Sequence, residues 1–99
     1  MKEKYLPVGT VVTLKEATKK VMIMGYFPMS DDNKVFDYNA CLYPEGVLNP
    51  KESLAFNHDK IKKINHLGME DEEYQKFNEQ LKGMVNGIEA LQKMELPKE

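Results

Sequence analysis

The hydrophobic pattern of this chain changes its period once, near residue 68, and this change limits the folds open to it. Before that point, short apolar segments with a period of two are separated by turns such as Pro44-Glu45-Gly46. After it, apolar residues recur every three or four positions, as in an amphipathic helix. The sequence therefore predicts an α+β fold in which a β-rich part is followed by one C-terminal helix. The strands are expected to form a small curved antiparallel sheet or an SH3-like, partly open barrel.

Five segments have the composition of strands. They are residues 10–15, 20–27, 35–43, 54–56 and 61–67. The second segment is apolar on both faces, with Met22, Met24 and Tyr26 on the face opposite Val21 and Ile23. A strand buried on one side only would alternate with polar residues. Its second face is therefore expected to be covered by another element or by a partner.

The length of 99 residues suits one domain, predicted over residues 1–99. Within it we expect a β-rich core over residues 5–68, a helix over residues 69–94 and a frayed tail over residues 95–99. The acidic run Glu70–Glu73 would oppose the positive end of the helix dipole.

The predicted helix carries a narrow apolar stripe with alternating spacings of three and four. Its members are Tyr74, Phe77, Leu81, Met84, Ile88 and Leu91. This spacing is typical of a coiled-coil seam, which another helix can cover, although the stripe could equally lie on the sheet. If the first half of the stripe packs on the sheet and the second half binds a partner, Tyr74 and Phe77 lie near the sheet. The candidate partner-binding residues are then Leu81, Met84, Ile88 and Leu91.

The motif content predicts no catalytic residue, no bound metal and no cofactor. Cys41 is the one cysteine, and its strand-like neighbours favour a buried hydrophobe over a reactive thiol. His58 and His66 lack the further Cys or His partners that a zinc site needs. The sequence contains neither a nucleophile elbow nor a glycine-rich phosphate loop.

The charge pattern predicts that the protein binds neither nucleic acid nor membrane. The formal net charge is -2, and lysines and acidic residues are dispersed through the chain. Lys60, Lys62 and Lys63 form a short basic cluster, interpreted as a strand edge that discourages pairing. No apolar run approaches the ~20 residues of a membrane span, and none follows the N-terminal charges. We therefore expect a cytoplasmic protein.

Several short runs together resemble a family of uncharacterised proteins. They are Tyr5–Val12, Val21–Tyr26, Asp37-Tyr38, Cys41–Gly46, Phe56–His58 and Leu67-Gly68. Over residues 5 to about 82 the chain resembles domain-of-unknown-function family 4176 of Gram-positive bacteria, and the run Cys41–Gly46 is the most specific part. The resemblance carries no catalytic residues. The matching residues are of types common in turns and cores, so they are interpreted as fold determinants. The expected structural motif consists of Tyr43, Pro44, Glu45, Gly46, Asn57 and His58.

Members of that family often lie beside genes for LXG-type toxins exported by type VII secretion. The resemblance therefore implies a non-enzymatic adaptor or chaperone that binds a helical toxin domain, or a chain that self-associates through its C-terminal helix. Three alternatives stay open. An immunity-like protein would expose an acidic or aromatic patch. An enzyme or small-ligand binder would have a deep pocket where Tyr43, Glu45 and His58 converge. An RNA-binding barrel would have a basic, aromatic-lined strand face.

Overall fold

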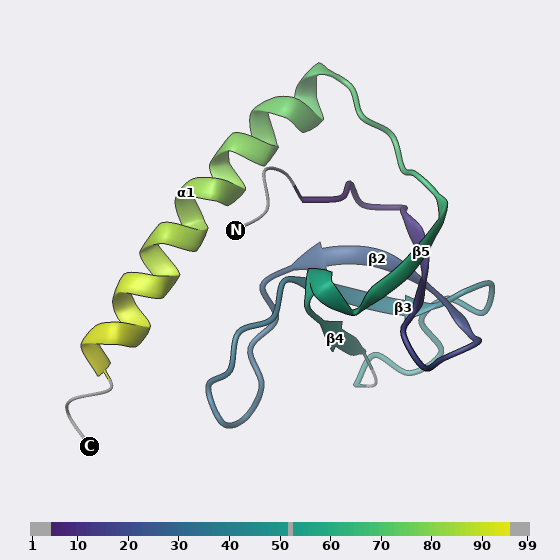
Figure 1. Ribbon diagram of the computed structural model, residues 1–99, viewed down its shortest axis with the longest axis horizontal. Coiled ribbons are helices and arrows are strands. Elements are labelled where there is room, and N and C mark those ends of the chain that lie inside the picture. Colours follow the sequence, from purple (N-terminus) through teal and green to yellow (C-terminus); the bar gives the residue numbers. More distant parts are fainter. Residues whose placement is uncertain (1–4, 52, 96–99) are drawn as a thin grey trace. The chain divides into compact units, whose positions relative to one another are not determined.

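The computed structural model describes residues 5–51 and 53–95, which form five strands, one 3-10 helix and one α-helix (Figure 1). The elements are β1 (Val11–Leu14), β2 (Lys20–Tyr26), β3 (Tyr38–Leu42), β4 (Leu54–Phe56), η1 (His58–Lys60), β5 (Ile61–His66) and α1 (Glu72–Glu95). The chain divides into two compact units, the β unit of residues 6–69 and the helical unit of Tyr5 with the residues from Glu70 onward. The predicted α+β fold is confirmed.

The five strands of the β unit form one antiparallel sheet in the order β4-β3-β2-β1-β5. In the described part of the chain, β4 and β5 are the two edges and do not pair with each other. Figure 1 shows that β5 bends strongly along β1. The sheet is therefore open and curved, the first of the two expected forms, and is not a closed barrel.

One face of the sheet, called here the inner face, holds the core of the β unit. Directly opposed residues on antiparallel strands point to the same side. The register in this way brings together six buried residues, in the pairs Val12 with Val21, Ile23 with Ala40, and Tyr38 with Phe56. Burial of a large aliphatic or aromatic side chain contributes about 1.5–3 kcal/mol, so this face supplies much of the stability of the unit.

A bulge in β2 changes which residues face the core. Between Ile23 and Gly25, β2 advances by two residues while β3 advances by one, so Met24 is an extra residue. The extra residue reverses the alternation and places Tyr26 opposite Tyr38, with ring centroids 6.0 Å apart. The prediction that Tyr26 shares a face with Met24 is wrong for this reason. Glycine inside a strand is the local sign of such a bulge.

The segment after β5 packs closely on the segment before β1. The Gly68 N–H donates a hydrogen bond to Thr10 Oγ1 at 3.0 Å. A Cβ atom at Gly68 would lie 2.5 Å from the carbonyl oxygen of Val8 and 3.1 Å from the backbone nitrogen of Thr10. Both neighbours are backbone atoms, which cannot rotate away as a flexible side chain can.

We therefore expect Gly68→Ala to lower the free energy of unfolding by about 1–3 kcal/mol, the usual cost of overpacking. Urea denaturation followed by circular dichroism measures it. Gly25→Ala is the matched control, because its Cβ would lie at an ordinary 3.7 Å from the Asn39 Cβ. Equal losses in the two variants would contradict the close approach at Gly68.

The helix begins three residues later than predicted because Asp71 caps it. The Asp71 Oδ1 accepts a hydrogen bond from the Tyr74 N–H at 2.9 Å, which is the geometry of an N-cap. The helix then starts at Glu72, and Glu72 and Glu73 occupy the first turn, where acidic side chains oppose the helix dipole.

Within the helical unit, Tyr5 is held against α1 by two hydrogen bonds. Its N–H donates to Asn78 Oδ1 at 2.9 Å, and the Tyr74 hydroxyl donates to its carbonyl oxygen. Tyr5, Tyr74 and Asn78 are all buried. A segment 73 positions earlier in the sequence thereby satisfies a buried polar side chain of the helix.

Candidate functional site

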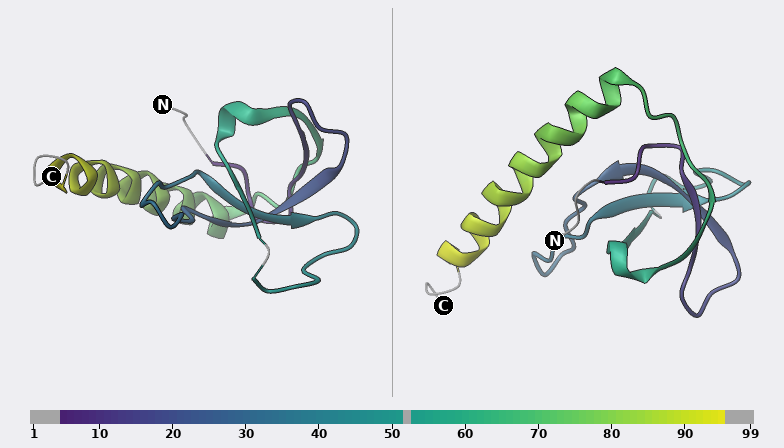
Figure 2. Two further views of the ribbon diagram at one scale, coloured as in Figure 1. Left: turned by 90° about the horizontal axis from the view of Figure 1, so that it is seen from below. Right: turned by 45° about the horizontal axis from the view of Figure 1, so that its top comes forward.

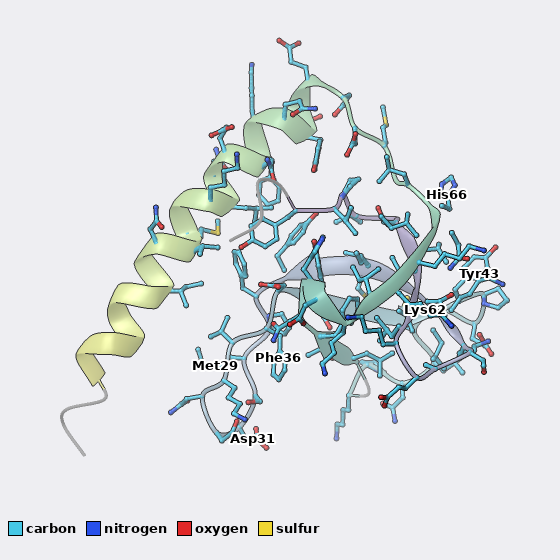
Figure 3. The ribbon with its side chains drawn as sticks, in the orientation of Figure 1. Met29, Asp31, Phe36, Tyr43, Lys62 and His66 are labelled. Carbon is cyan, nitrogen blue, oxygen red and sulfur yellow. The ribbon has the colours of Figure 1, made fainter. Side chains whose placement is uncertain are left out.

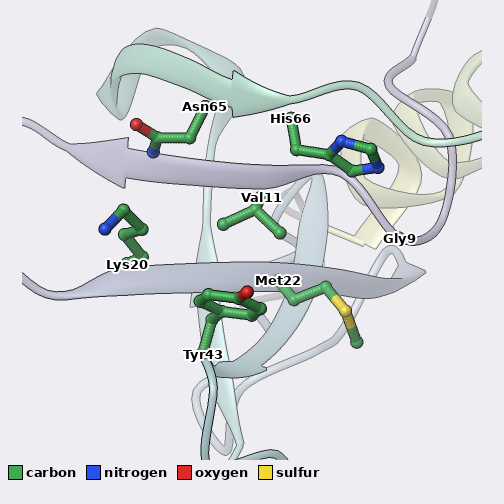
Figure 4. Close-up of a pocket in the computed structure, with 7 residues that line it drawn as sticks. All are labelled: Gly9, Val11, Lys20, Met22, Tyr43, Asn65 and His66. Atoms are coloured by element: carbon green, nitrogen blue, oxygen red, sulfur yellow. The ribbon is translucent and has the colours of Figure 1, made fainter.

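The outer face of the sheet, opposite the inner face, carries an open hollow with a volume of about 590 Å³ (Figure 4). The described residues that line it belong to the β unit and are Gly9, Val11, Lys20, Met22, Tyr43, Asn65 and His66. Val11 and Met22 oppose each other across β1 and β2 and form its apolar part. The volume lies within the range of about 300–1,000 Å³ that is usual for ligand sites.

The pairing of β5 with β1 has two register shifts, and the one between Ile64 and His66 brings two polar side chains to this hollow. Between Ile64 and His66, β5 advances by two residues while β1 advances by one, so Asn65 is the extra residue. Both Asn65 and His66 line the hollow, whereas a regular strand would send one of them to the inner face. The Asn65 Nδ2 donates to Thr13 Oγ1 at 2.9 Å, which orients the amide.

Two lysines lie in one row across the outer face. Thr13 on β1 opposes Lys20 on β2 and Lys63 on β5, so the three side chains share a face. Both lysines are exposed, and no acidic residue in the described part of the chain lines the hollow. This lysine row, defined by Lys20, Thr13 and Lys63, gives this side of the sheet a local positive charge despite the net charge of -2.

Tyr43 is positioned by the turn that follows β3. Its N–H donates to the carbonyl oxygen of Lys20 at 3.0 Å, which holds it beside the start of β2, and its side chain is 43% exposed. The peptide bond between Tyr43 and Pro44 is cis. Gly46 has a φ of 79° and donates its N–H to the Leu42 carbonyl oxygen at 2.8 Å. The turn expected at Pro44–Gly46 is confirmed, and glycine suits its left-handed backbone.

Glu45 points to a different partner. Its carboxylate lies 2.7 Å from Lys19 Nζ. The hydrogen bond from Lys19 holds the pKa of Glu45 below its ordinary value. The pair is exposed to water, where such bridges contribute little to stability. Lys19 does, however, neutralise the charge of Glu45, the one carboxylate close in sequence to Tyr43. Glu45 therefore does not cancel the positive charge of the lysine row.

Asn57 and His58 join η1 to the start of β3. Asn57 Oδ1 accepts a hydrogen bond from the Asp37 N–H at 3.1 Å, and the His58 N–H donates to Asp37 Oδ2 at 2.8 Å. His58 Nδ1 lies 2.8 Å from the hydroxyl of Tyr38, whose oxygen also accepts the Leu6 N–H at 3.1 Å. This network ties together loop and strand segments of the β unit.

The structure therefore separates Tyr43, Glu45 and His58, which the small-ligand alternative would bring into one pocket. Tyr43 lines the hollow, Glu45 pairs with Lys19, and His58 contacts Tyr38. Cys41 is buried. Among the described residues, no three His, Cys, Asp or Glu side chains lie close enough together to hold a metal ion. None of the helices in residues 5–51 and 53–95 combines the length and apolar character needed to cross a membrane.

On α1, the apolar stripe is divided between buried and exposed residues. Leu81 is 1% exposed, whereas Phe77 is 40% and Met84 46% exposed. Ile88 is half-buried, and the side chain of Leu91 lies outside the described residues. The expectation that Phe77 is core and Leu81 is open to a partner is therefore reversed. The buried side of the helix runs through Asn78, a polar residue that an apolar pattern leaves out.

Most of the hollow was not singled out from the sequence. Tyr43 is predicted only as part of the structural motif, and His66 enters the sequence analysis only as a histidine without zinc-site partners. The spacing of Lys20 and Met22 places them on one face, which is a signal that the strand pattern does contain. Asn65 joins them only through the bulge in β5, and that bulge has no glycine to mark it.

Residues 5–77 match the family described as Domain of unknown function (DUF4176). The chain belongs to this family. The DUF4176 match covers the β unit, and with it every residue that lines the hollow, and ends at Phe77 near the start of α1. Met84 and Ile88 lie beyond it. Comparison with curated proteins and with solved structures gives no match.

Proposed function

We propose that this DUF4176 protein is a non-enzymatic, protein-binding accessory factor that works in the cytoplasm. Its partner is a helical domain of an LXG-type toxin exported by type VII secretion, which it holds as an adaptor or chaperone. The observation that supports binding is the exposure of Phe77 and Met84, at 40% and 46%, on one side of α1. The gene neighbourhood that the family resemblance implies supports the choice of partner.

The geometry of α1 suits this role. Phe77 and Met84 are seven residues apart, two helical turns, and so lie on the same side of the helix. A helical partner that covered them would gain about 1.5–3 kcal/mol for each side chain fully removed from water. Phenylalanine and methionine are also residue types enriched in the centres of protein interfaces. An exposed pair at this spacing matches the seam through which two helices pack.

The test is co-purification of the full chain with the N-terminal helical domain of an LXG-type toxin encoded beside it. We expect a stable complex with the wild-type protein. Met84→Asp should weaken the complex at least about tenfold, because the partner would then bury an unpaired carboxylate. Asn86→Asp is the matched control: it adds the same charge at an exposed position on the opposite side of α1, and binding should be retained.

Two outcomes would contradict the proposal. One is the absence of any complex with the wild-type chain. The other is an equal loss of binding in Met84→Asp and Asn86→Asp, which would show that the added negative charge weakens binding wherever it is placed. Light scattering of the chain alone measures self-association. If the chain were a dimer that Met84→Asp dissociates, this side of α1 would bind a second copy of the chain instead of a toxin.

A further inference from the structure

The outer-face hollow is the feature of the β unit that the helix-based proposal leaves unused. We propose that it binds a short acidic peptide segment in an extended conformation. An apolar side chain of the segment sits on Val11 and Met22, and its carboxylates are held by Lys20 and Lys63. This site lies in the β unit and does not involve the exposed side of α1, so it does not rest on capture of a helix.

The apolar part of the hollow accounts for the anchoring side chain. Val11 is 6% exposed and Met22 is half-buried, and the two lie opposite each other across β1 and β2. Figure 4 shows the ring of Tyr43 beside Met22, where it forms one wall. An aliphatic or aromatic side chain placed here would contact apolar atoms of both strands and the tyrosine ring. Tyrosine in such a place offers a large contact area at low entropic cost.

The two lysines favour a peptide segment with acidic side chains. Lys20 and Lys63 flank Thr13 on the same face, and neither forms a salt bridge with a carboxylate in the described part of the chain. The described residues of the lining include no Asp or Glu, so an anionic group entering the hollow meets no like charge from them. Opposite charges near a surface attract weakly and are screened by salt. Binding by the lysine row must therefore weaken as the salt concentration rises.

The remaining polar groups of the hollow favour a peptide over a simple anion as the ligand. Because Asn65 Nδ2 donates to Thr13, its Oδ1 is the group left to accept a hydrogen bond from a peptide N–H. The imidazole of His66 and the hydroxyl of Tyr43 stand on opposite sides of the hollow and add further polar contacts (Figure 4). A hollow with donors, an acceptor and an apolar centre matches an extended backbone with alternating side chains.

A single-stranded nucleic acid fits these observations less well. Such sites combine basic grooves with several aromatic side chains on which successive bases stack. Among the described residues that line the hollow, Tyr43 is the one Phe, Tyr or Trp, and His66 adds only an imidazole. The net charge of -2 also opposes a long polyanion more than it opposes a segment with a few carboxylates.

The test uses the full chain and a fluorescein-labelled peptide, Asp-Asp-Leu-Phe-Asp-Glu, with affinity measured by fluorescence polarisation. We expect Lys20→Glu and Lys63→Glu each to weaken binding at least about tenfold, since each replaces an attraction by a repulsion. Lys34→Glu is the matched control, because it makes the same charge change at an exposed position in the loop between β2 and β3. In the view of Figure 3, Met29 and Asp31 of that loop lie at the opposite end of the β unit from Tyr43 and His66.

Three further measurements sharpen the result. The peptide with Asn and Gln in place of Asp and Glu should bind at least about tenfold more weakly, and added salt should reduce binding of the acidic peptide. Met84→Asp should leave peptide binding unchanged, so a failure of this proposal and a failure of helix capture give different results. Thermal melts of Lys20→Glu and Lys63→Glu should match the wild type, because both lysines are exposed.

The proposal would be overturned by a wild-type protein that does not bind the peptide at millimolar concentration. It would also be overturned if Lys34→Glu weakened binding as much as Lys20→Glu, which would leave only a net-charge effect. Tighter binding of oligouridine than of the peptide, lost in Lys20→Glu, would assign the hollow to nucleic acid instead.

Discussion

Leu81→Asp is expected to lower the free energy of unfolding by about 3 kcal/mol or more, because it buries an unpaired carboxylate and removes a large apolar side chain. Leu81 is 1% exposed. The same substitution at Phe77, which is 40% exposed and four residues away, is expected to cost about 1 kcal/mol or less, since water can reach the new charge. Both variants place an aspartate where a large apolar side chain stood on one helix, and the two positions differ in exposure.

Urea denaturation followed by the helical circular dichroism signal measures both variants. Leu81→Ala is the intermediate control, with an expected loss of about 2–5 kcal/mol from the lost side chain alone. Phe77→Asp should remain folded and lose capture of a helical partner, which separates its role in binding from any role in stability. If Phe77→Asp unfolded the protein as severely as Leu81→Asp, the assignment of Phe77 to an exposed binding side would be wrong.

The exchange of roles between Phe77 and Leu81 shows why the face of a helix is harder to predict than the helix itself. The spacing of apolar residues predicts α1 correctly, and Asp71 followed by acidic residues marks its start. The pattern gives only apolar positions, however, and the buried side here runs through Asn78. Its amide oxygen can be buried at low cost because the Tyr5 N–H donates to it, a contact between distant parts of the sequence that no local pattern contains.

The sheet was predicted more completely, because each strand has its own local signal. The five predicted strand segments correspond to β1 to β5, and η1 lies between the last two with Asn57 as its N-cap. The third strand is shorter than expected, since Val35 forms an isolated bridge with Met29 and belongs to the preceding loop. Figure 2 shows the first part of the following connection, residues 43–51, extending away from the strands. Strand ends of this kind depend on loop pairing and are poorly marked in a sequence.

The outer-face hollow could not be predicted from local sequence patterns, because it depends on how the strands pair. A regular alternation would place Asn65 and His66 on opposite faces, and only the bulge in β5 brings both to the outer face. Similarly, Lys63 joins Lys20 only because β5 returns to pair with β1 on the side away from β2. The basic cluster was interpreted as a strand edge, which β5 is, but the pairing adds that Lys63 shares a face with the hollow. Such a site follows from register, which is set by long-range packing.

The most damaging substitution within the β unit is expected to be Tyr38→Ala, with a loss of about 3–5 kcal/mol in the free energy of unfolding. Tyr38 is fully buried, at 0% exposure. Its ring centroid lies 5.5 Å from that of Phe56, 5.8 Å from that of His58 and 6.0 Å from that of Tyr26. Alanine would leave a cavity bounded by three rings from different segments, and a cavity of that size cannot close without moving the strands.

Tyr38→Phe isolates the hydroxyl from the ring. It should cost about 1–3 kcal/mol, because the Leu6 N–H then loses its acceptor in a buried position. Tyr43→Phe, at an exposed tyrosine, is the control and should change stability by less than about 0.5 kcal/mol. Hydrogen exchange supplies a second readout: the amide of Leu6 should exchange faster in Tyr38→Phe, whereas the Ile23 amide, which donates to Thr10, should not. If Tyr38→Phe were as stable as the wild type and the Leu6 amide kept its protection, the hydroxyl would not be what anchors the segment before β1.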